Sequence, residues 1–364
     1  MSHVSSKIKY KKIMMSGGGT GGSVAPLVAV WEELKNDNNF SFVWVGTKEG
    51  VEKEMLKNTG IKFLAISSGK LRRYWSWQNL LDIFLINIGF WQALPMLMKE
   101  KPNVIITAGS FVSVPLVWAG WLLRIPILVH QQDAVPGLAN RLMASFARKI
   151  TVALEKSLSD YGKRAEWIGN PIRKELVEVR VSRQEALTKL GLTASQPVLL
   201  VLGGGTGALP INELIKNNLP ELLKFCQLVH ITGQGKSIIS TTDSNYHSFE
   251  FLDTFGLIKV FAAADVVISR CGMNVLTELS YLGKPSILIP IPDSHQEANA
   301  KIFAEKNAAV VLAQDKISNQ EFVARIKNLI NDKNTQNELS ANIQTVIKKG
   351  ANERLVEIVR KIIS

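Results

Sequence analysis

The sequence DVVISRCGMNVLTELSYLGKPSILIPIPDSHQEANA, residues 265–300, decides the fold of this chain. A short apolar run at 266–269 is typical of a buried strand, and Gly272 separates it from a helically spaced segment at 273–281. A second apolar strand is expected at 286–291. Where a strand delivers the chain onto a helix N-terminus, free N–H groups and the helix dipole favour an anion. The stretch therefore predicts a parallel α/β sheet with an anion site at Gly272.

Glu278 extends this prediction from an anion to a nucleotide. Leu276 and Leu279 are expected to face the core, and Glu278 to face the other way. At about 1.5 Å of rise per residue, Glu278 lies roughly 7 to 9 Å along the helix from Gly272, about the span from a diphosphate to the ribose of one nucleotide. Its carboxylate would suit two vicinal hydroxyls.

Two glycine-rich loops occur at matching places in the two halves of the chain. A strand at 9–16 leads into the loop 17–23 and a helix at 25–34, and a strand at 197–202 leads into the loop 203–208 and a helix from about 211. Backbone without side chains can approach a phosphate or a sugar. The first loop is neither a dinucleotide fingerprint nor a P-loop, and a tight structural turn is its alternative interpretation. One such loop in each half predicts two similar α/β domains that face one cleft and bind a ligand.

Length and composition agree with two domains. The chain has 364 residues, of which 46% are hydrophobic. Its two cysteines, Cys226 and Cys271, give no disulfide framework and fit a reducing cytoplasm. The polar, basic start shows no signal peptide. Residues 104–123 lack charge over the length of a membrane span, but Gly109 and Pro115 favour a strand, a loop and a helix there.

The positive charge is concentrated in the first half of the chain. The net charge is +12, and residues 1–170 carry 21 Lys and Arg against 12 Asp and Glu, whereas residues 171–364 carry 22 against 19. An anionic partner is therefore expected at the first half. Nucleic acid is disfavoured because there is no RNP, zinc-finger or helix-turn-helix signature, which leaves an anionic membrane surface.

Residues 68–91 have the composition of a segment that lies at a membrane interface. The candidates for membrane contact are Arg72, Arg73, Trp75, Trp77, Phe84 and Trp91. Basic side chains reach lipid headgroups, Trp favours the interface, and an apolar face enters the acyl boundary. A buried core helix is the alternative, although Asp82, Asn87 and Gln92 leave only a narrow polar side.

Polar loops that end predicted strands supply the candidate bases. His130 and Asp133 are the best general-base candidates by type and position, although Asp133 could instead cap the helix that follows. Residues 168–173 are interpreted as the crossing between the domains. There Arg173 could clamp a diphosphate, or could be a surface arginine.

Six motifs taken together resemble the MurG family of bacterial glycosyltransferases, glycosyltransferase family 28, over nearly the whole chain. In order they are residues 18–22, 134–141, 169–173, the second glycine loop, 269–278 and 295–300. The family moves N-acetylglucosamine from a UDP donor to lipid I and so makes lipid II for peptidoglycan. The resemblance implies an inverting hexosyltransferase of GT-B architecture, with two Rossmann-like domains whose parallel sheets face a central cleft. It assigns 1–168 to the acceptor and the membrane, 169–340 to the donor, and 341–364 to a C-terminal helix that could pack back on the first domain.

The resemblance also implies roles for individual residues. The donor-binding residues would be Thr20, Gly21, Gly22, Asp133, Arg173, Gly205, Thr206, Leu252, Met273, Asn274, Val275, Leu276, Thr277, Glu278 and Gln296. Leu252 would meet the uracil through its backbone, Glu278 the ribose, and Arg173 the diphosphate, whose charge builds as UDP departs. Without an Asp-x-Asp motif, no metal and no other cofactor is expected.

The implied partners are UDP-N-acetylglucosamine, lipid I, an anionic membrane surface and cell-wall assembly proteins. The implied location is peripheral, at the cytoplasmic face of the bacterial cell membrane. A different lipid-linked acceptor, a UDP-N-acetylglucosamine epimerase and a non-catalytic scaffold that binds a nucleotide sugar are the alternatives.

Three departures from the family pattern affect the expected chemistry. Ser23 stands where histidine is usual, and serine is no base at neutral pH. The usual His-Glu-Gln-Asn is His130-Gln131-Gln132-Asp133 here, so that one carboxylate is lost and another is gained. Gly205 replaces the usual serine of the second loop. Either Asp133 is the base, or the acceptor differs, or turnover is impaired, and the catalytic candidates Asp133, His130 and Ser23 stay unranked.

Overall fold

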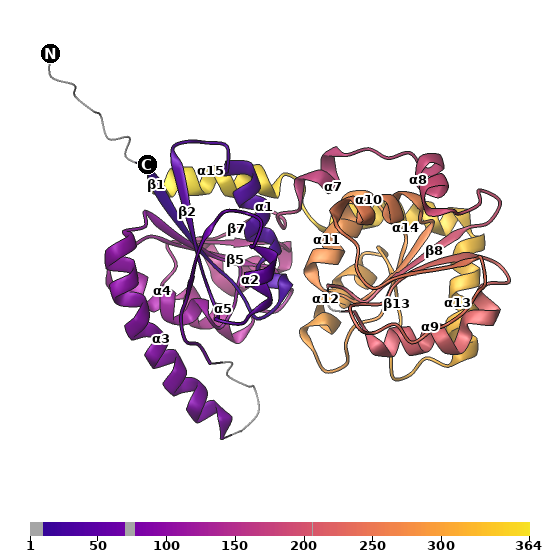
Figure 1. The fold of residues 1–364 in the computed structure, drawn as a ribbon, viewed down its shortest axis with the longest axis horizontal. Helices are drawn as coiled ribbons and strands as arrows, with labels where there is room; N and C mark the ends of the chain where they lie inside the picture. The colour runs from indigo at the N-terminus through magenta and orange to yellow at the C-terminus, as the bar shows by residue number, and fades with distance from the viewer. Residues whose placement is uncertain (1–9, 70–76, 206) are drawn as a thin grey trace, which may run out of the picture. The chain divides into compact units, whose positions relative to one another are not determined.

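The computed structural model describes residues 10–69, 77–205 and 207–364, and contacts divide the chain into two compact units. The first unit holds the chain up to Gln132, Pro136–Arg173 and Lys348–Ser364, and the second holds Asp133–Val135 and Lys174–Ile347. Each unit is a parallel sheet covered by helices (Figure 1). The prediction of two parallel α/β domains is therefore confirmed.

The first unit contains a seven-stranded parallel sheet. In spatial order its strands are β3 (Lys62–Ala65), β2 (Phe40–Gly46), β1 (Lys11–Ser16), β4 (Val104–Thr107), β5 (Ile127–Gln131), β6 (Lys149–Val152) and β7 (Ala165–Trp167). The α-helices described in this unit are α1 (Ala25–Leu34), α2 (Val51–Met55), α3 (Gln78–Glu100), α4 (Ser113–Leu122), α5 (Leu138–Ala144), α6 (Leu158–Tyr161) and α15 (Ala351–Ile363).

Successive side chains of β1 enter separate cores on the two faces of this sheet, as strand geometry requires. Met14 packs with Leu97 of α3 on one face, and Met15 packs with Leu27 of α1 and Leu355 of α15 on the other. All five side chains are at most 1% exposed, and burying each contributes about 1.5 to 3 kcal/mol. The amphipathic C-terminal helix is thus part of the core of the first unit.

The second unit contains a six-stranded parallel sheet. Its spatial order is β10 (Tyr246–Phe249), β9 (Gln227–Ile231), β8 (Val198–Leu202), β11 (Val266–Ser269), β12 (Ser286–Leu288) and β13 (Val310–Val311). The α-helices described in this unit are α7 (Lys174–Glu178), α8 (Arg183–Leu190), α9 (Leu209–Leu222), α10 (Thr254–Ala263), α11 (Met273–Leu282), α12 (His295–Glu305), α13 (Asn319–Asn331) and α14 (Lys333–Val346).

Several sequence-based boundaries differ from the structure. The units divide after Arg173 and after Ile347, whereas residues 168 and 340 were expected. The strand expected at 286–291 is shorter, because β12 ends at Leu288. In the same sheet β10 ends at Phe249. The reason is local, because Asp253 accepts a hydrogen bond from the Gly256 N–H (2.7 Å) and caps α10. The uncharged run 104–123 forms β4, a loop and α4, as predicted.

Within the described residues, one helical segment, Leu81–Glu100 of α3, is long and apolar enough to cross a membrane when judged by length and composition alone. Its side chains Ile86, Ala93 and Leu97 are at most 4% exposed. At its C-terminal end the Glu100 carboxylate pairs with Lys12 of β1 (2.8 Å) and Lys62 of β3 (2.5 Å). These contacts attach the C-terminal half of α3 to the first unit.

Candidate functional site

The first glycine loop lies at the carboxyl edge of the first sheet. Ser16, the last residue of β1, pairs in register with Val45 of β2 and with Thr107 of β4, so the loops that follow these strands meet at one edge. Thr20 and Gly22 are exposed there. The edge therefore offers these two residues to a ligand, while their role in binding the donor stays a prediction.

Ser23 is 6% exposed and closes the glycine loop on itself. Its Oγ accepts a hydrogen bond from the Gly18 N–H (3.1 Å) and donates one to the Gly18 carbonyl (3.2 Å). Both functions of the hydroxyl are thereby used within the loop. The geometry supports a bracing role for Ser23 and gives no support to a role as base.

His130 is fully buried near the end of β5. Its Nε2 lies 2.9 Å from Asn170 Oδ1 and its Nδ1 lies 2.9 Å from Thr151 Oγ1, so that both ring nitrogens have partners. Burial lowers the pKa of His130 to about 4, although the hydrogen bond with Asn170 opposes the shift. The ring is neutral at neutral pH and both of its nitrogens are engaged within the first unit, while its role as a base stays a prediction.

Gln131, which replaces the family's usual carboxylate, is 1% exposed. Its Oε1 accepts hydrogen bonds from Tyr161 Oη (3.1 Å) and from Asn140 Nδ2. A glutamate would accept the same two bonds with one oxygen. The departure at Gln131 therefore changes a buried acceptor and removes no exposed base.

Asp133 is the most accessible of the catalytic candidates. Residues 133–135 group with the second unit, where Asp133 Oδ1 accepts a hydrogen bond from Asn299 Nδ2 (3.0 Å) and lies 3.9 Å from His295 Nε2. About a third of its side chain, 34%, is exposed. Asn299 is fully buried and also accepts from the Ala134 N–H (2.8 Å), so it orients this short segment. A partly solvated, oriented carboxylate has the form of a general base.

The second glycine loop follows β8 at the carboxyl edge of the second sheet. Gly205 is exposed, and Thr206 lies outside the described residues. Gly207 has a φ of +70°, and a Cβ there would overlap the Thr232 backbone, so only glycine fits this contact with the loop after β9. Lys236 Nζ contacts the Gly207 carbonyl from the same loop (3.4 Å).

A buried amide holds the loop after β9. Asn212 of α9 donates from Nδ2 to the carbonyls of Thr232 (3.0 Å) and Lys236 (3.0 Å), and its Oδ1 lies 3.0 Å from His230 Nε2. His230 Nδ1 in turn lies 3.0 Å from Tyr246 Oη. Burial lowers the pKa of His230 to about 4, so the ring stays neutral. Sequence reasoning missed Asn212, which carries no motif of its own.

Helix α11 begins at Met273 after Gly272, as predicted, but its Glu278 is buried. Glu278 is only 8% exposed, whereas the sequence predicted that it faces away from the core. Helices α14 and α7 pack against α11, so the face opposite the sheet is covered as well. The contact of Glu278 with the ribose stays a prediction. If it forms, the Glu278 carboxylate that makes it is almost fully desolvated.

Side chains at the start of α11 are mostly inaccessible. Met273, Val275, Leu276 and Thr277 are at most 6% exposed, and Asn274 is half-buried. A ligand at this helix start would therefore meet backbone N–H groups.

Gln296 braces the entrance to this helix. Its Oε1 accepts from the Cys271 N–H (3.1 Å) and the Ile291 N–H (3.3 Å), tying α12 to the segment before α11. Leu252 is half-buried in the loop after β10, and Arg173 is half-exposed as the last residue of the first unit. Their donor contacts stay predictions.

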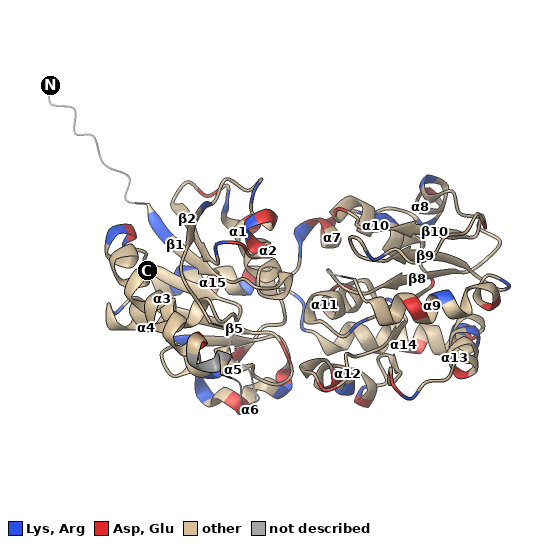
Figure 2. Cartoon of the chain, turned by 60° about the horizontal axis from the view of Figure 1, so that its bottom comes forward, with Lys and Arg blue, Asp and Glu red and all other residues tan. Residues whose placement is uncertain are grey.

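Helix α3 presents a row of large apolar side chains to solvent. Leu81 is 65%, Phe84 64% and Trp91 68% exposed, and Trp77, immediately before the helix, is 71% exposed. Asp82, Lys99 and Glu100 are the charged residues of this helix, and the ribbon of α3 is almost free of charge in Figure 2. The other predicted membrane residues, Arg72, Arg73 and Trp75, lie outside the described residues.

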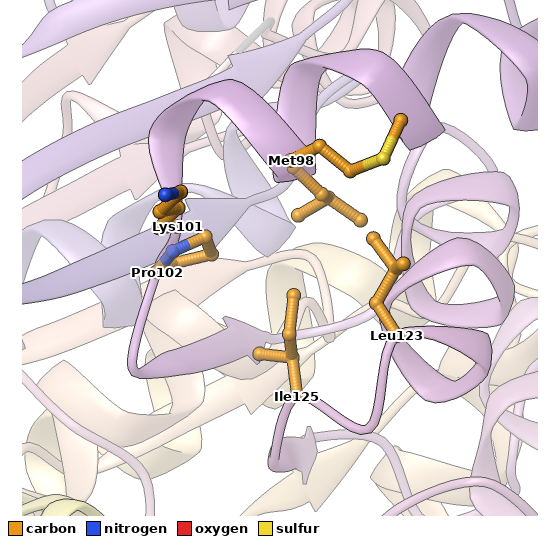
Figure 3. Close-up of a pocket in the computed structure, with 6 residues that line it drawn as sticks. Met98, Lys101, Pro102, Leu123 and Ile125 are labelled. Atoms are coloured by element: carbon orange, nitrogen blue, oxygen red, sulfur yellow. The ribbon is translucent and has the colours of Figure 1, made fainter.

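A shallow pocket of about 380 Å³ lies between the C-terminal ends of α3 and α4 (Figure 3). Met98 and Lys101 line one side, and Leu123 and Ile125 the other. Because these residues precede β4 and β5, the pocket is at the amino edge of the sheet, opposite the glycine loop. In the part of the chain that the structure describes, no group of three or more His, Cys, Asp or Glu side chains could hold a metal ion.

Comparisons with known proteins agree with this architecture. The glycosyltransferase family 28 N-terminal domain matches residues 13–152, and the glycosyltransferase family 28 C-terminal domain matches residues 198–355. A Bacillus cereus relative named UDP-N-acetylglucosamine–N-acetylmuramyl-(pentapeptide) pyrophosphoryl-undecaprenol N-acetylglucosamine transferase 2 is 38% identical over 325 residues, covering 88% of this chain and 91% of the relative. A Clostridium kluyveri protein, named as the same transferase without the number, is 38% identical over 331 residues, covering 89% of this chain and 93% of that protein.

Solved structures show the same fold. Acinetobacter baumannii MurG has a TM-score of 0.75 at 23% identity and covers 96% of this chain and 99% of its own. The UDP-GlcNAc 2-epimerase of Neisseria meningitidis has a TM-score of 0.68 at 15% identity, with 96% and 100% covered. At these identities the likeness concerns the fold alone.

Two parallel α/β units, each with a glycine loop at its carboxyl edge, and the matches above define a glycosyltransferase with the GT-B fold. Both domain models match in order and the relatives align over nine-tenths of their length. The chain belongs to glycosyltransferase family 28.

Proposed function

We propose that this enzyme transfers N-acetylglucosamine from UDP-N-acetylglucosamine to undecaprenyl-diphosphate-linked N-acetylmuramoyl-pentapeptide, which is the peptidoglycan reaction that its relatives are named for. The observation that carries the proposal is the match at 38% identity along nine-tenths of a relative with that name. Two departures from the family pattern, Ser23 and Gln131, are buried hydrogen-bonding groups here. Their departures therefore favour no second function.

In the reaction, an acceptor hydroxyl oxygen bonds to the anomeric carbon of the donor sugar while the bond from that carbon to the UDP oxygen breaks. The hydroxyl proton passes to a base, and UDP departs with the electron pair. Asp133 is the base in this proposal because its carboxylate is partly solvated and is held by Asn299. The donor is bound in the second unit, with Glu278 at the ribose and the backbone at the start of α11 near the diphosphate.

The enzyme works at the cytoplasmic face of the bacterial membrane, with α3 lying on the lipid surface. The exposed side chains Phe84 and Trp91 of α3, and Trp77 immediately before it, support this part of the proposal, since other residues of the same helix are fixed in the core. Vesicle sedimentation tests it. Phe84→Ser is expected to reduce the bound fraction, while the equally drastic Phe255→Ser, at an exposed position of α10, leaves the fraction unchanged. Equal binding by both variants would contradict lipid contact through α3.

The transfer itself is tested with labelled UDP-N-acetylglucosamine and the lipid-linked acceptor, with and without a chelator. The proposal expects label in the lipid fraction at equal rates in both samples, because no divalent metal takes part in it. Label that stays in the nucleotide-sugar pool would contradict the transfer. Transfer that the chelator abolishes would contradict the metal-free mechanism alone.

A further inference from the structure

Glu52 of α2 is a fully buried carboxylate beneath the first glycine loop. Its Oε2 accepts a hydrogen bond from the Gly19 N–H (3.0 Å), and its Oε1 accepts from the Thr47 N–H (2.7 Å) and Thr47 Oγ1 (2.6 Å). Gly19 belongs to the loop after β1 and Thr47 to the loop after β2. A single carboxylate thus joins two loops at the edge of the sheet where a ligand is expected. Burying a charge is unfavourable unless it is hydrogen-bonded, and these three donors compensate it.

The Glu52 carboxylate occupies space that side chains at three neighbouring glycines would fill. A Cβ added at Gly18 or at Gly50 would overlap carboxylate atoms of Glu52, and one added at Gly46 would come within 2.9 Å of its Cγ and Oε1. None of the three glycines has a positive φ, and Gly50 has extended backbone (φ −79°, ψ 159°) that any residue can adopt. Their lack of side chains is explained by Glu52 and not by backbone conformation.

Two amides of the first glycine loop are hydrogen-bonded within the protein. The Gly18 N–H is bound by Ser23 and the Gly19 N–H by Glu52, so neither amide is available to a ligand. Residues Thr20 to Gly22 follow these two glycines, and Thr20 and Gly22 are exposed to solvent. The hydrogen bonds to Ser23 and Glu52 therefore leave residues 20–22 as the part of the loop that can contact a ligand.

We propose that Glu52 is a positioning residue for the acceptor: its carboxylate holds the first glycine loop in the conformation that presents residues 20–22 to the lipid-linked substrate. This inference rests on the proposed function, in which the donor is bound in the second unit. It assigns residues 20–22 to the acceptor, which the family resemblance places at residues 1–168, in place of the donor contact that the resemblance implied for these three residues. Glu52 touches no substrate and acts only through the loop, while the donor is bound in the second unit. Its loss therefore affects one substrate and leaves the other unaffected.

The first test measures the KM for each of the two substrates in Glu52→Gln. The amide nitrogen cannot accept the Gly19 N–H, so the KM for the lipid-linked acceptor is expected to rise about tenfold, the effect of leaving a buried donor unsatisfied. The KM for UDP-N-acetylglucosamine is expected to stay within about twofold. Glu54→Gln is the matched control, because Glu54 is in the same helix with a side chain 79% exposed. An unchanged acceptor KM, or equal rises in both constants, would overturn the proposal.

The second test uses the steric relation between Glu52 and Gly50. Gly50→Ala forces the carboxylate out of its site, so it is expected to raise the acceptor KM as Glu52→Gln does. In a Glu52→Ala background the space is empty, and adding Gly50→Ala is expected to change nothing further. Effects that add in the double variant would show that the glycine and the carboxylate act independently.

A third readout needs no substrate and separates this inference from the proposed function. Hydrogen exchange in a peptide covering residues 17–22 is expected to be about tenfold faster in Glu52→Gln and Gly50→Ala than in the wild type. Unchanged exchange would overturn the positioning role whatever the activity. Faster exchange in an enzyme that transfers no sugar to the acceptor would leave the loop assignment standing and contradict the proposed function.

Discussion

Acid is expected to destabilise each unit through one buried histidine, His130 in the first unit and His230 in the second. Burial lowers both pKa values from an ordinary 6.5 to about 4. Between these values the unfolded chain binds a proton that the folded chain excludes, so the contribution of neutral histidine to stability is present above pH 6.5 and is lost as the pH falls toward 4. Integration gives a loss of about 2 kcal/mol per histidine between pH 7 and pH 5.

The two units can be followed separately by urea unfolding. All eight tryptophans lie at or before residue 167, within the first unit, so tryptophan fluorescence reports on that unit, while circular dichroism reports on both. His130→Gln is expected to reduce the difference in unfolding free energy between pH 7 and pH 5 by about 2 kcal/mol when fluorescence is measured. His230→Gln is expected to leave the fluorescence-detected difference unchanged and to reduce the one seen by circular dichroism.

The result also bears on catalysis. If His130→Gln unfolds with the same pH dependence as the wild type, His130 is not a neutral buried residue in solution, and the argument against its role as base fails. If the pH dependence disappears as expected while the stable fraction retains kcat within about tenfold, His130 has a structural role and the base lies elsewhere.

Three further substitutions examine the site residues one at a time. Asp133→Asn is expected to lower kcat by about 100-fold or more with little change in donor KM, and a wild-type kcat would give the base role to another group or to water. Glu278→Ala is expected to raise the Kd for UDP-N-acetylglucosamine by about 5- to 150-fold in a calorimetric titration, because a desolvated hydrogen-bond partner of the ribose is lost, and an unchanged Kd would show that the ribose lies elsewhere. Gln131→Glu is expected to keep kcat within about threefold, since a carboxylate can accept the same bonds from Tyr161 and Asn140; a large gain would indicate that the lost carboxylate is catalytic.

Elements with a strong local pattern could be predicted closely from the sequence. The strand at 266–269 has the predicted bounds, and α11 begins at Met273 as expected. It ends one residue later than predicted, where Gly283 adopts the left-handed conformation (φ 62°) that terminates helices. Both glycine loops follow the strands that the apolar runs indicated.

The burial of polar groups could not be read from local pattern, because it depends on contacts between residues far apart in the sequence. Glu278 was assigned to an open helix face, but α14, more than 50 residues later, packs on α11. The partners of the candidate base His130, which are Thr151 and Asn170, lie 21 and 40 residues away in the sequence. Glu52 lies in a short polar segment that gave no signal, and only the glycines around it, at 18, 46 and 50, show that space was kept for its carboxylate.

The most direct test of the central claim is the mass of the lipid-linked product. The enzyme is incubated with UDP-N-acetylglucosamine and undecaprenyl-diphosphate-N-acetylmuramoyl-pentapeptide, and the lipid and nucleotide fractions are analysed together. The account predicts that each lipid molecule gains one N-acetylhexosamine and that UDP appears in equal amount. An unchanged lipid mass would contradict it, whether the donor is hydrolysed to UDP and free sugar or is converted to an epimeric sugar nucleotide.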